Sequence, residues 1–424
     1  MEARRPKGRR SPPDLVHGWI ILDHFIHSSD GDVDVDADDD VTASKIALTC
    51  SGRRVRASLR VADPPAVSRL RIHRLDADQP WPDAYILRHA QVVAAHRGSI
   101  LFWARVPFAD DEFVVPGYFP VDYFVYTAGG AAASSPPWRT SRSSTALNHH
   151  ERSPSPAQWR MHRLEMQRTP IRKKQMRRKL SKWVNDVVLP LHDGRHLCLV
   201  DYYRGILLVD AKELQHFRYI PLPEEAMMHG CRHYEEDDPD PARCASATCA
   251  GSITLVCIYN GSGRKKNKSA PPATFIIKSW TLIDIHKCIW LHDFTMEADE
   301  FWRICARENE LRLPLVTPSF PVVSLVDLHA ISFLLKDGEN GLYWLVEVDM
   351  RNKAMISPAA LYINEEEEEG RCCGDNEIWK PFDGHYFIPS WFTSYLHEDP
   401  IQSRQLSQMM QNTKYERTMH KIGW

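Results

Sequence analysis

The chain has 424 residues, of which 43% are hydrophobic and 25% are charged, and its formal net charge is −2. These proportions are typical of globular proteins, so they exclude a collagen-like repeat, a chain that is disordered throughout and a bundle of membrane helices. The small net charge conceals a segregation, because residues 138–183 carry 13 Lys and Arg against two Glu, a local charge of +11.

The N-terminal part begins with a basic, proline-rich arm over residues 1–13, which no continuous apolar stretch follows. We therefore expect no secretory signal, and since the chain has no run of 18 apolar residues we expect no membrane span. These observations favour an intracellular protein of the cytoplasm, the nucleus or both. Its ten cysteines are then expected to remain free thiols.

Residues 14–128 are predicted to form the N-terminal β part of a propeller-like domain. Residues 129–182 are rich in Ala, Ser, Pro and Arg, a composition that buries too little apolar surface to order itself. We expect this segment to be a disordered insertion or a degenerate coding region.

The clearest strand signals lie at residues 197–201 and 206–210, two apolar runs joined by a short link that contains glycine. This pattern predicts a β-hairpin, and because each run is apolar on both faces, both faces should be buried. Residues 252–259, 274–285, 331–336 and 342–350 give similar signals. Residues 337–341 are predicted to be the hairpin loop between the last two strands.

Helical signals are few. Residues 298–307 predict one short helix, and residues 400–417, within a tail at 396–424, predict another. Strands at short intervals indicate a sandwich, a barrel or a propeller. Because about 400 residues exceed one sandwich, we expect a mainly β, β-propeller-like fold, with an incomplete ring as an alternative.

The segment after residue 182 resembles the signature of a plant family that is expanded in grasses and catalogued only as a domain of unknown function. The matching motifs lie in order at residues 183–190, 193–207, 217–223, 277–282, 318–323 and 342–351, and include Leu-Cys-Leu-Val-Asp-Tyr-Tyr-Arg-Gly-Ile-Leu. The resemblance implies a β domain over residues 183–395 but no activity. The motifs also look similar to propeller-like modules attached to F-boxes, here without an F-box. Positions of the signature that we expect to be structural are Trp183, Asp201, Tyr202, Tyr203, Gly205, Trp280 and Trp344.

Candidate metal sites are poor matches to known loops. Residues 30–40 alternate Asp with other residues, but in both frames Val or Ala occupies the positions of the turn glycine and the closing carboxylate of a calcium loop. Cys231, His233, Cys244 and Cys249 provide zinc-ligand types without finger or ribbon spacing. The chain also has no Gly-x-Ser-x-Gly elbow and no phosphate-binding loop. We therefore expect no cofactor, no metal and no catalytic site.

The basic segment at residues 172–182 permits three interpretations. It is a solvated linker, a nuclear or nucleic-acid-binding patch, or a basic amphipathic helix, since Met176, Leu180, Trp183, Val184 and Val187 follow helical spacing. The family resemblance instead places residues 183–191 in a strand. The candidate patch consists of Arg172, Lys173, Lys174, Arg177, Arg178, Lys179 and Lys182.

These observations favour a non-catalytic scaffold that binds another, unidentified protein. The alternative is a nuclear protein that associates with nucleic acid through the basic patch.

Overall fold

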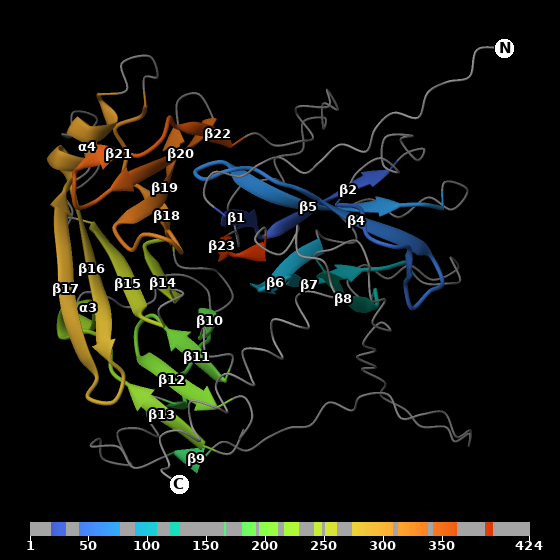
Figure 1. Cartoon of the computed structure of the whole chain (residues 1–424), viewed down its shortest axis with the longest axis horizontal. Coiled ribbons are helices and arrows are strands. Elements are labelled where there is room, and N and C mark those ends of the chain that lie inside the picture. The colour runs from blue at the N-terminus through green and yellow to red at the C-terminus, as the bar shows by residue number, and fades with distance from the viewer. Residues whose placement is uncertain are drawn as a thin grey trace, which may run out of the picture. The chain divides into compact units, whose positions relative to one another are not determined.

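The computed structural model of the chain describes residues 18–30, 42–76, 90–107, 119–127, 165–166, 180–191, 195–210, 216–228, 241–247, 251–260, 274–307, 313–337, 342–362 and 386–392 (Figure 1). Strands account for 59% of this part of the chain and helices for 7%, so the expected mainly β fold is confirmed. Within it, no helix has the length and apolar character needed to cross a membrane.

The chain divides into two compact units. The first comprises Met1–Asp63, Val67–Thr140 and Ser390–Trp424, and the second comprises Pro64–Ala66 and Ser141–Pro389. Each unit is described by itself below.

The first unit is built on one sheet with β5 at its centre. Strand β5 pairs antiparallel with β4 and parallel with β1 and β2, while β6, β7 and β8 form an antiparallel meander joined to β2. Its strands are β1 (Ile20–Asp23), β2 (Phe25–Asp30), β3 (Ala47–Leu48), β4 (Arg54–Arg60), β5 (Val67–Arg74), β6 (Ala90–His96), β7 (Ser99–Arg105) and β8 (Val121–Thr127). Strand β1 and the residue before it form part of the core of this unit, since Trp19, Ile20, Ile21 and Leu22 are all completely buried.

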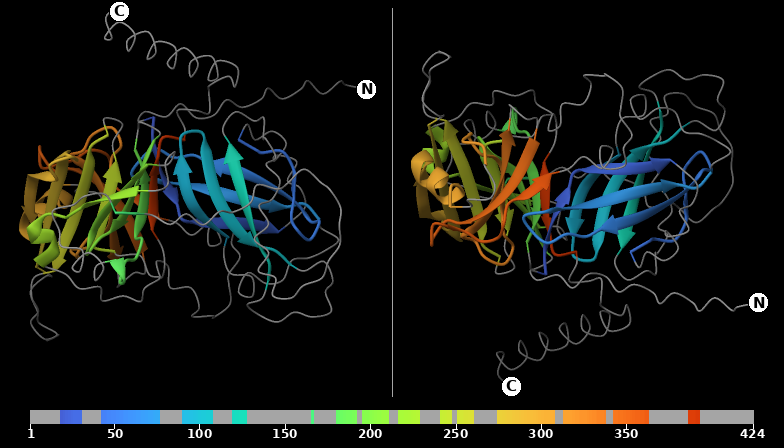
Figure 2. Two further views of the ribbon diagram at one scale, coloured as in Figure 1. Left: turned by 90° about the horizontal axis from the view of Figure 1, so that it is seen from below. Right: turned by 90° about the horizontal axis from the view of Figure 1, so that it is seen from above.

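The described residues of the second unit form three sheets in chain order, here called sheets I, II and III (Figure 1, Figure 2). Sheet I contains β9 (Glu165–Met166), β10 (Val187–Pro190), β11 (His196–Asp201), β12 (Gly205–Asp210) and β13 (His216–Ile220). Sheet II follows helix α3 (Glu224–Met228) and contains β14 (Arg243–Ala247), β15 (Ile253–Asn260), β16 (Phe275–Asp284) and β17 (Ile289–Glu297). Sheet III follows helix α4 (Ala298–Cys305) and contains β18 (Ser319–Val323), β19 (Ala330–Asp337), β20 (Leu342–Asp349), β21 (Ala354–Met355) and β22 (Ala360–Tyr362). The last strand that the structure describes is β23 (Phe387–Ser390).

The predicted hairpins are confirmed. Strands β11 and β12 pair antiparallel from His196 opposite Asp210 to Asp201 opposite Gly205. Strands β19 and β20 pair in the same way up to Asp337 opposite Leu342. The predicted strands at residues 252–259 and 274–285 correspond to β15 and β16.

Sheet II is apolar on both faces because it lies between the other two sheets. On one side Trp280 and Leu282 pack with residues of sheet I, and on the other Phe275 and Ile277 pack with α4 and sheet III. The first strand of sheet II, β14, lies beside β10, an edge strand of sheet I, and beside β18, an edge strand of sheet III. Successive antiparallel sheets stacked with these edge strands adjacent agree with a propeller-like fold, and none of the described sheets is closed.

The three helical predictions have different outcomes. Residues 298–305 form α4, whose buried face carries Phe301, Trp302 and Ile304, as the apolar spacing predicted. The amphipathic helix that was proposed to run from Met176 to Val187 is wrong at its C-terminal end, since residues 183–186 are not helical and Val187 begins β10. The hydrophobic residues there pack against sheet I instead. The predicted helix at residues 400–417 lies outside the described residues.

Candidate functional site

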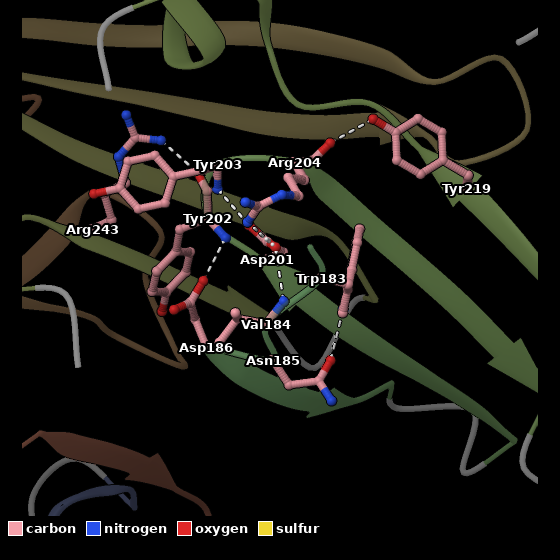
Figure 3. A network of polar contacts seen from close by, with 10 residues as sticks. All are labelled: Trp183, Val184, Asn185, Asp186, Asp201, Tyr202, Tyr203, Arg204, Tyr219 and Arg243. Carbon is pink, nitrogen blue, oxygen red and sulfur yellow. Dashed lines mark hydrogen bonds and ion pairs between the residues drawn. The ribbon is translucent and has the colours of Figure 1, made fainter. Parts of the chain in front are cut away.

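The family-signature segment forms a tight turn between β11 and β12, here called the Asp201 turn (residues 201–205). Asp201 is completely buried at the end of β11. Its Oδ1 accepts a hydrogen bond of 3.0 Å from the Tyr203 N–H, and its Oδ2 accepts one of 3.0 Å from the Val184 N–H (Figure 3). The Arg204 guanidinium donates to the same Oδ2 at 2.8 Å. The buried carboxylate is therefore compensated by an ion pair and two backbone donors.

A second carboxylate fixes the segment before β10 to the same turn. The Tyr202 N–H donates to Asp186 Oδ2 at 2.7 Å, and the Asp186 N–H donates to the Val200 carbonyl at 2.9 Å. Together with the bond from Val184 to Asp201, these contacts hold residues 184–186 against the end of β11. Nearby, the Trp183 indole N–H donates to Asn185 Oδ1 at 2.8 Å, and the half-buried Trp183 packs beside Leu207 and Tyr219.

The turn ends at a glycine because the next strand lies too close for a side chain. Gly205 has a φ of +148°, and a Cβ built there would lie 2.5 Å from Tyr219 Cε2 and 2.8 Å from the Ile220 carbonyl oxygen. Tyr219 is held in place, since its hydroxyl donates to the Arg204 carbonyl at 2.5 Å. Burial, followed by the charge of Asp201, raises the pKa of Tyr219 to about 12. The phenol thus remains a donor at neutral pH.

Arg243, the first residue of β14, joins the Asp201 turn to sheet II. Its buried guanidinium donates to the carbonyl of Tyr202 and, at 3.0 Å, to the Ala226 carbonyl in α3. It also lies 4.3 Å from the centre of the Tyr203 ring, which is a cation–π distance. One side chain therefore connects sheet I, α3 and sheet II.

The chemistry of this network is that of a structural junction. The polar groups of Asp201, Asp186, Tyr219 and Arg243 bond to backbone or side-chain groups of the same network (Figure 3). Donors already occupy the carboxylate oxygens that would act as a base, and satisfied buried networks of this kind rigidify a core. Trp280 is buried between sheets I and II, and Trp344 is half-buried beside sheet II and α4.

The predicted basic patch falls mostly outside the described residues. Lys182 is described and exposed, in the turn before Trp183; the other positions, Arg172, Lys173, Lys174, Arg177, Arg178 and Lys179, are not described. Only Cys244 of the zinc hypothesis is described, in β14, where burial raises the pKa of its thiol to about 12. Among the described residues no group of three or more His, Cys, Asp and Glu could hold a metal ion.

Sequence reasoning missed Asp186, Tyr219 and Arg243. Their roles depend on partners brought together by strand pairing and by the packing of sheet II on sheet I, as in the bond from Arg243 to Tyr202, 41 residues away. The sequence contained one indication of the roles of Asp186 and Tyr219, because both lie within the matching motifs. Nothing in the local sequence distinguished Arg243.

A comparison with known families covers part of this junction, from the end of β11 onwards. Residues 200–331 match a family described as "Protein of unknown function (DUF1618)". The match covers the Asp201 turn, all of sheet II and the first strand of sheet III. It confirms that the chain resembles a domain-of-unknown-function family. No curated protein matches the chain.

Proposed function

We propose that this protein, which carries a DUF1618 region, is an intracellular, non-catalytic scaffold that binds another protein. The observation that carries the proposal is the contrast between the two kinds of side chain in the second unit. The polar groups of the Asp201 turn serve internal bonds, and the bond from the Arg243 guanidinium to the Tyr202 carbonyl joins sheets I and II. Large apolar side chains are meanwhile exposed on sheet II, including Ile283 at 58% and Leu291 at 54%.

Exposed apolar residues close together on a rigid sheet are typical of protein-binding surfaces, whereas single ones are ordinary. The pairing of β16 with β17 places Thr281 opposite Leu291 and Asp284 opposite Ile289, with Ile283 between them. Three exposed apolar side chains thus lie within two residues of each other along this hairpin. We infer that the β16–β17 hairpin presents these three side chains to a partner protein.

The test is affinity purification of the tagged full chain from its native cells, with and without nuclease, followed by direct binding assays with each purified candidate. A protein that survives nuclease and binds in the two-component assay supports the scaffold. If every captured protein fails that assay, the scaffold function is rejected.

A nucleic-acid role is the second candidate, and the observation that favours it is the density of Lys and Arg at residues 172–182. Phosphate contacts release counterions, so affinity would fall steeply with salt. Replacement of Arg177, Arg178 and Lys179 by alanine would reduce the slope of log K against log salt by up to about 3. A salt slope that the triple variant leaves unchanged would reject this candidate.

A further inference from the structure

Strands β4 and β5 of the first unit concentrate arginine, although the chain as a whole is nearly neutral. Residues 53–74 carry seven Arg against one Asp, a local charge of +6. The two strands pair antiparallel and are drawn side by side in Figure 1, and neither contains a carboxylate. Opposite charges usually balance one another across a strand pair, so this pair of strands departs from the common pattern.

The arginines gather on one face of the two strands. The other face belongs to the core of the unit, where Leu59, Leu70 and Ile72 are buried. Successive residues of a strand alternate between faces and directly opposite residues share one, so three consecutive cross-strand pairs form the face away from the core. This surface, here called the arginine face, consists of Arg56 opposite His73, Ser58 opposite Arg71, and Arg60 opposite Arg69.

Three side chains of the arginine face bond within the sheet. Arg69 Nε lies 3.5 Å from Asp23 Oδ2, and both side chains are buried, so this ion pair belongs to the interior. The Ser58 hydroxyl oxygen and His73 Nε2 lie 2.8 Å apart, at hydrogen-bond distance. These contacts give the face a fixed support.

The other guanidinium groups of the face belong to Arg56, Arg60 and Arg71. Arg60 is exposed and the other two are half-buried. Arg71 lies opposite Ser58, midway between Arg56 and Arg60, and residues four apart in a strand are separated by about 14 Å. Three permanent positive charges are therefore spread over about 14 Å of one surface.

We propose that the arginine face binds the sugar–phosphate backbone of double-stranded nucleic acid, independently of sequence. A guanidinium pairs with a phosphate group through two parallel hydrogen bonds and stays charged at physiological pH. Duplex DNA carries one phosphate charge per about 1.7 Å of its axis, so a surface of this length meets more phosphates than it has arginines. Contacts to the backbone carry no sequence information. This inference goes beyond the scaffold function and uses residues other than the basic patch at 172–182.

Other anionic partners fit the arginine face less well. Single strands bind largely through aromatic side chains on which their bases stack, and none of the six positions of the face is Phe, Tyr or Trp. An acidic peptide gains affinity from apolar anchors or by adding a strand to a sheet edge. None of the six positions is apolar, and β5 lies inside the sheet between β4 and both β1 and β2. A duplex backbone requires neither feature.

The experiment is an anisotropy titration of the full chain against a fluorescein-labelled DNA duplex of about 20 base pairs, at about 50 to 200 mM salt. Three phosphate contacts predict a slope of log K against log salt of about −2.7 or steeper, an affinity loss of about 40-fold over this range. Replacement of Arg56, Arg60 and Arg71 by glutamine should reduce the slope by about 2.7. Replacement of the same three residues by lysine keeps the charges and should retain the slope.

A matched control removes the same charge from the second unit. Arg303, Arg307 and Arg351 are all exposed there, and their replacement by glutamine should leave the slope unchanged. Thermal melting followed by circular dichroism should show that the variants are folded. If the triple glutamine variant of the arginine face is unfolded, Arg60→Gln alone should reduce the slope by about 0.9.

The same titration in a chain with Arg177→Ala, Arg178→Ala and Lys179→Ala separates the arginine face from the basic patch. Contacts at separate sites add, so the glutamine variant should lower the slope equally in both backgrounds. A slope that the glutamine variant leaves unchanged overturns the proposal, whatever the alanine substitutions do. Absence of binding up to about 100 μM protein at low salt also overturns it. If the duplex binds only after the aspartates of residues 30–40 are replaced by asparagine, the chain's own acidic tract is the occupant and the proposal is likewise overturned.

Discussion

Replacement of Gly205 by alanine tests whether the Asp201 turn depends on the close approach of β12 to β13. The new Cβ would lie 2.5 Å from Tyr219 Cε2, 2.9 Å from Tyr219 Cζ and 2.8 Å from the Ile220 carbonyl oxygen. The ring cannot rotate away without breaking the bond from its hydroxyl to the Arg204 carbonyl. The Ile220 oxygen belongs to the backbone of β13, so its displacement would disturb the pairing of β12 with β13.

The expected loss of stability has two parts. Overpacking of a well-packed site costs about 1–3 kcal/mol, and a non-glycine residue in a sparsely populated backbone region costs about 1–3 kcal/mol more. The sum, about 2–6 kcal/mol, is a large fraction of the 5–15 kcal/mol that is typical of a folded domain.

Hydrogen exchange of the backbone amides in β11, β12 and β13 measures this loss locally. Gly251→Ala is the matched control, since Gly251 has a φ of +82° and nothing within 4 Å of its added Cβ. That variant carries backbone strain without the clash, so it should lose about 1–2 kcal/mol around β15. Equal losses in the two variants would refute the argument that close approach to β13 selects glycine at position 205.

Three further predictions concern the same junction. Asp201→Asn removes the ion pair with Arg204, whose side chain is 25% exposed, and should cost about 2 kcal/mol by local hydrogen exchange. Because the pKa of Tyr219 rises from 10.0 to about 12 on folding, its protonated form contributes stability that is complete below pH 10 and lost as the pH rises towards 12. A Tyr219→Phe variant should lack this part of the alkaline destabilisation in urea titrations, about 2–3 kcal/mol. Arg243→Met should lower the free energy of local opening in both α3 and the Asp201 turn by about 1–3 kcal/mol, measured as faster hydrogen exchange. Arg195→Ala removes a half-exposed ion pair with Asp210 and should change the free energy of unfolding by less than about 1 kcal/mol.

The strands of the second unit were predictable because each is a short apolar run bounded by turn residues. The hairpin of β11 and β12 is the clearest case, and its expected burial on both faces follows from packing on two sides. For residues 274–285 the sequence did not permit an assignment of faces. The reason is physical: with sheet II between two sheets, Ile277 and Trp280 are both buried on opposite sides, so no polar face produced an alternation.

The site was predictable only in part. The signature identified the Asp201 turn, but the partners that give its residues their roles come from β13, α3 and β14. Periodicity also suggested a helix through Val184 and Val187. That helix competed with a backbone bond from Val184 to the buried Asp201 carboxylate and with the pairing of Val187 in β10, and these long-range contacts prevailed.

The sheets of the second unit also repeat a turn that sequence comparison within the chain did not reveal. In each of three turns an aspartate at the end of a strand accepts a hydrogen bond at Oδ1 from the N–H two residues later, at distances of 3.0, 2.8 and 2.9 Å for Asp201, Asp284 and Asp349. At Asp284 this arrangement lowers the pKa of the carboxyl group, mainly through the N–H of Lys287. The common element is therefore one aspartate and a backbone geometry, which is too little sequence for a repeat to be recognised.

The fourth residue after each aspartate shows why the signature is distinctive in sheet I alone. That residue has a positive φ in all three turns, +148° at Gly205 and +55° at both Cys288 and Lys353. The backbone differs, since Cys288 and Lys353 lie in the left-handed region, which costs a non-glycine residue about 1–2 kcal/mol, whereas a φ of +148° is sparsely populated by residues other than glycine. The space differs as well, because at Gly205 Tyr219 and the Ile220 carbonyl lie where a Cβ would be. The glycine of the signature thus reports the packing of β13 and Tyr219 against the turn.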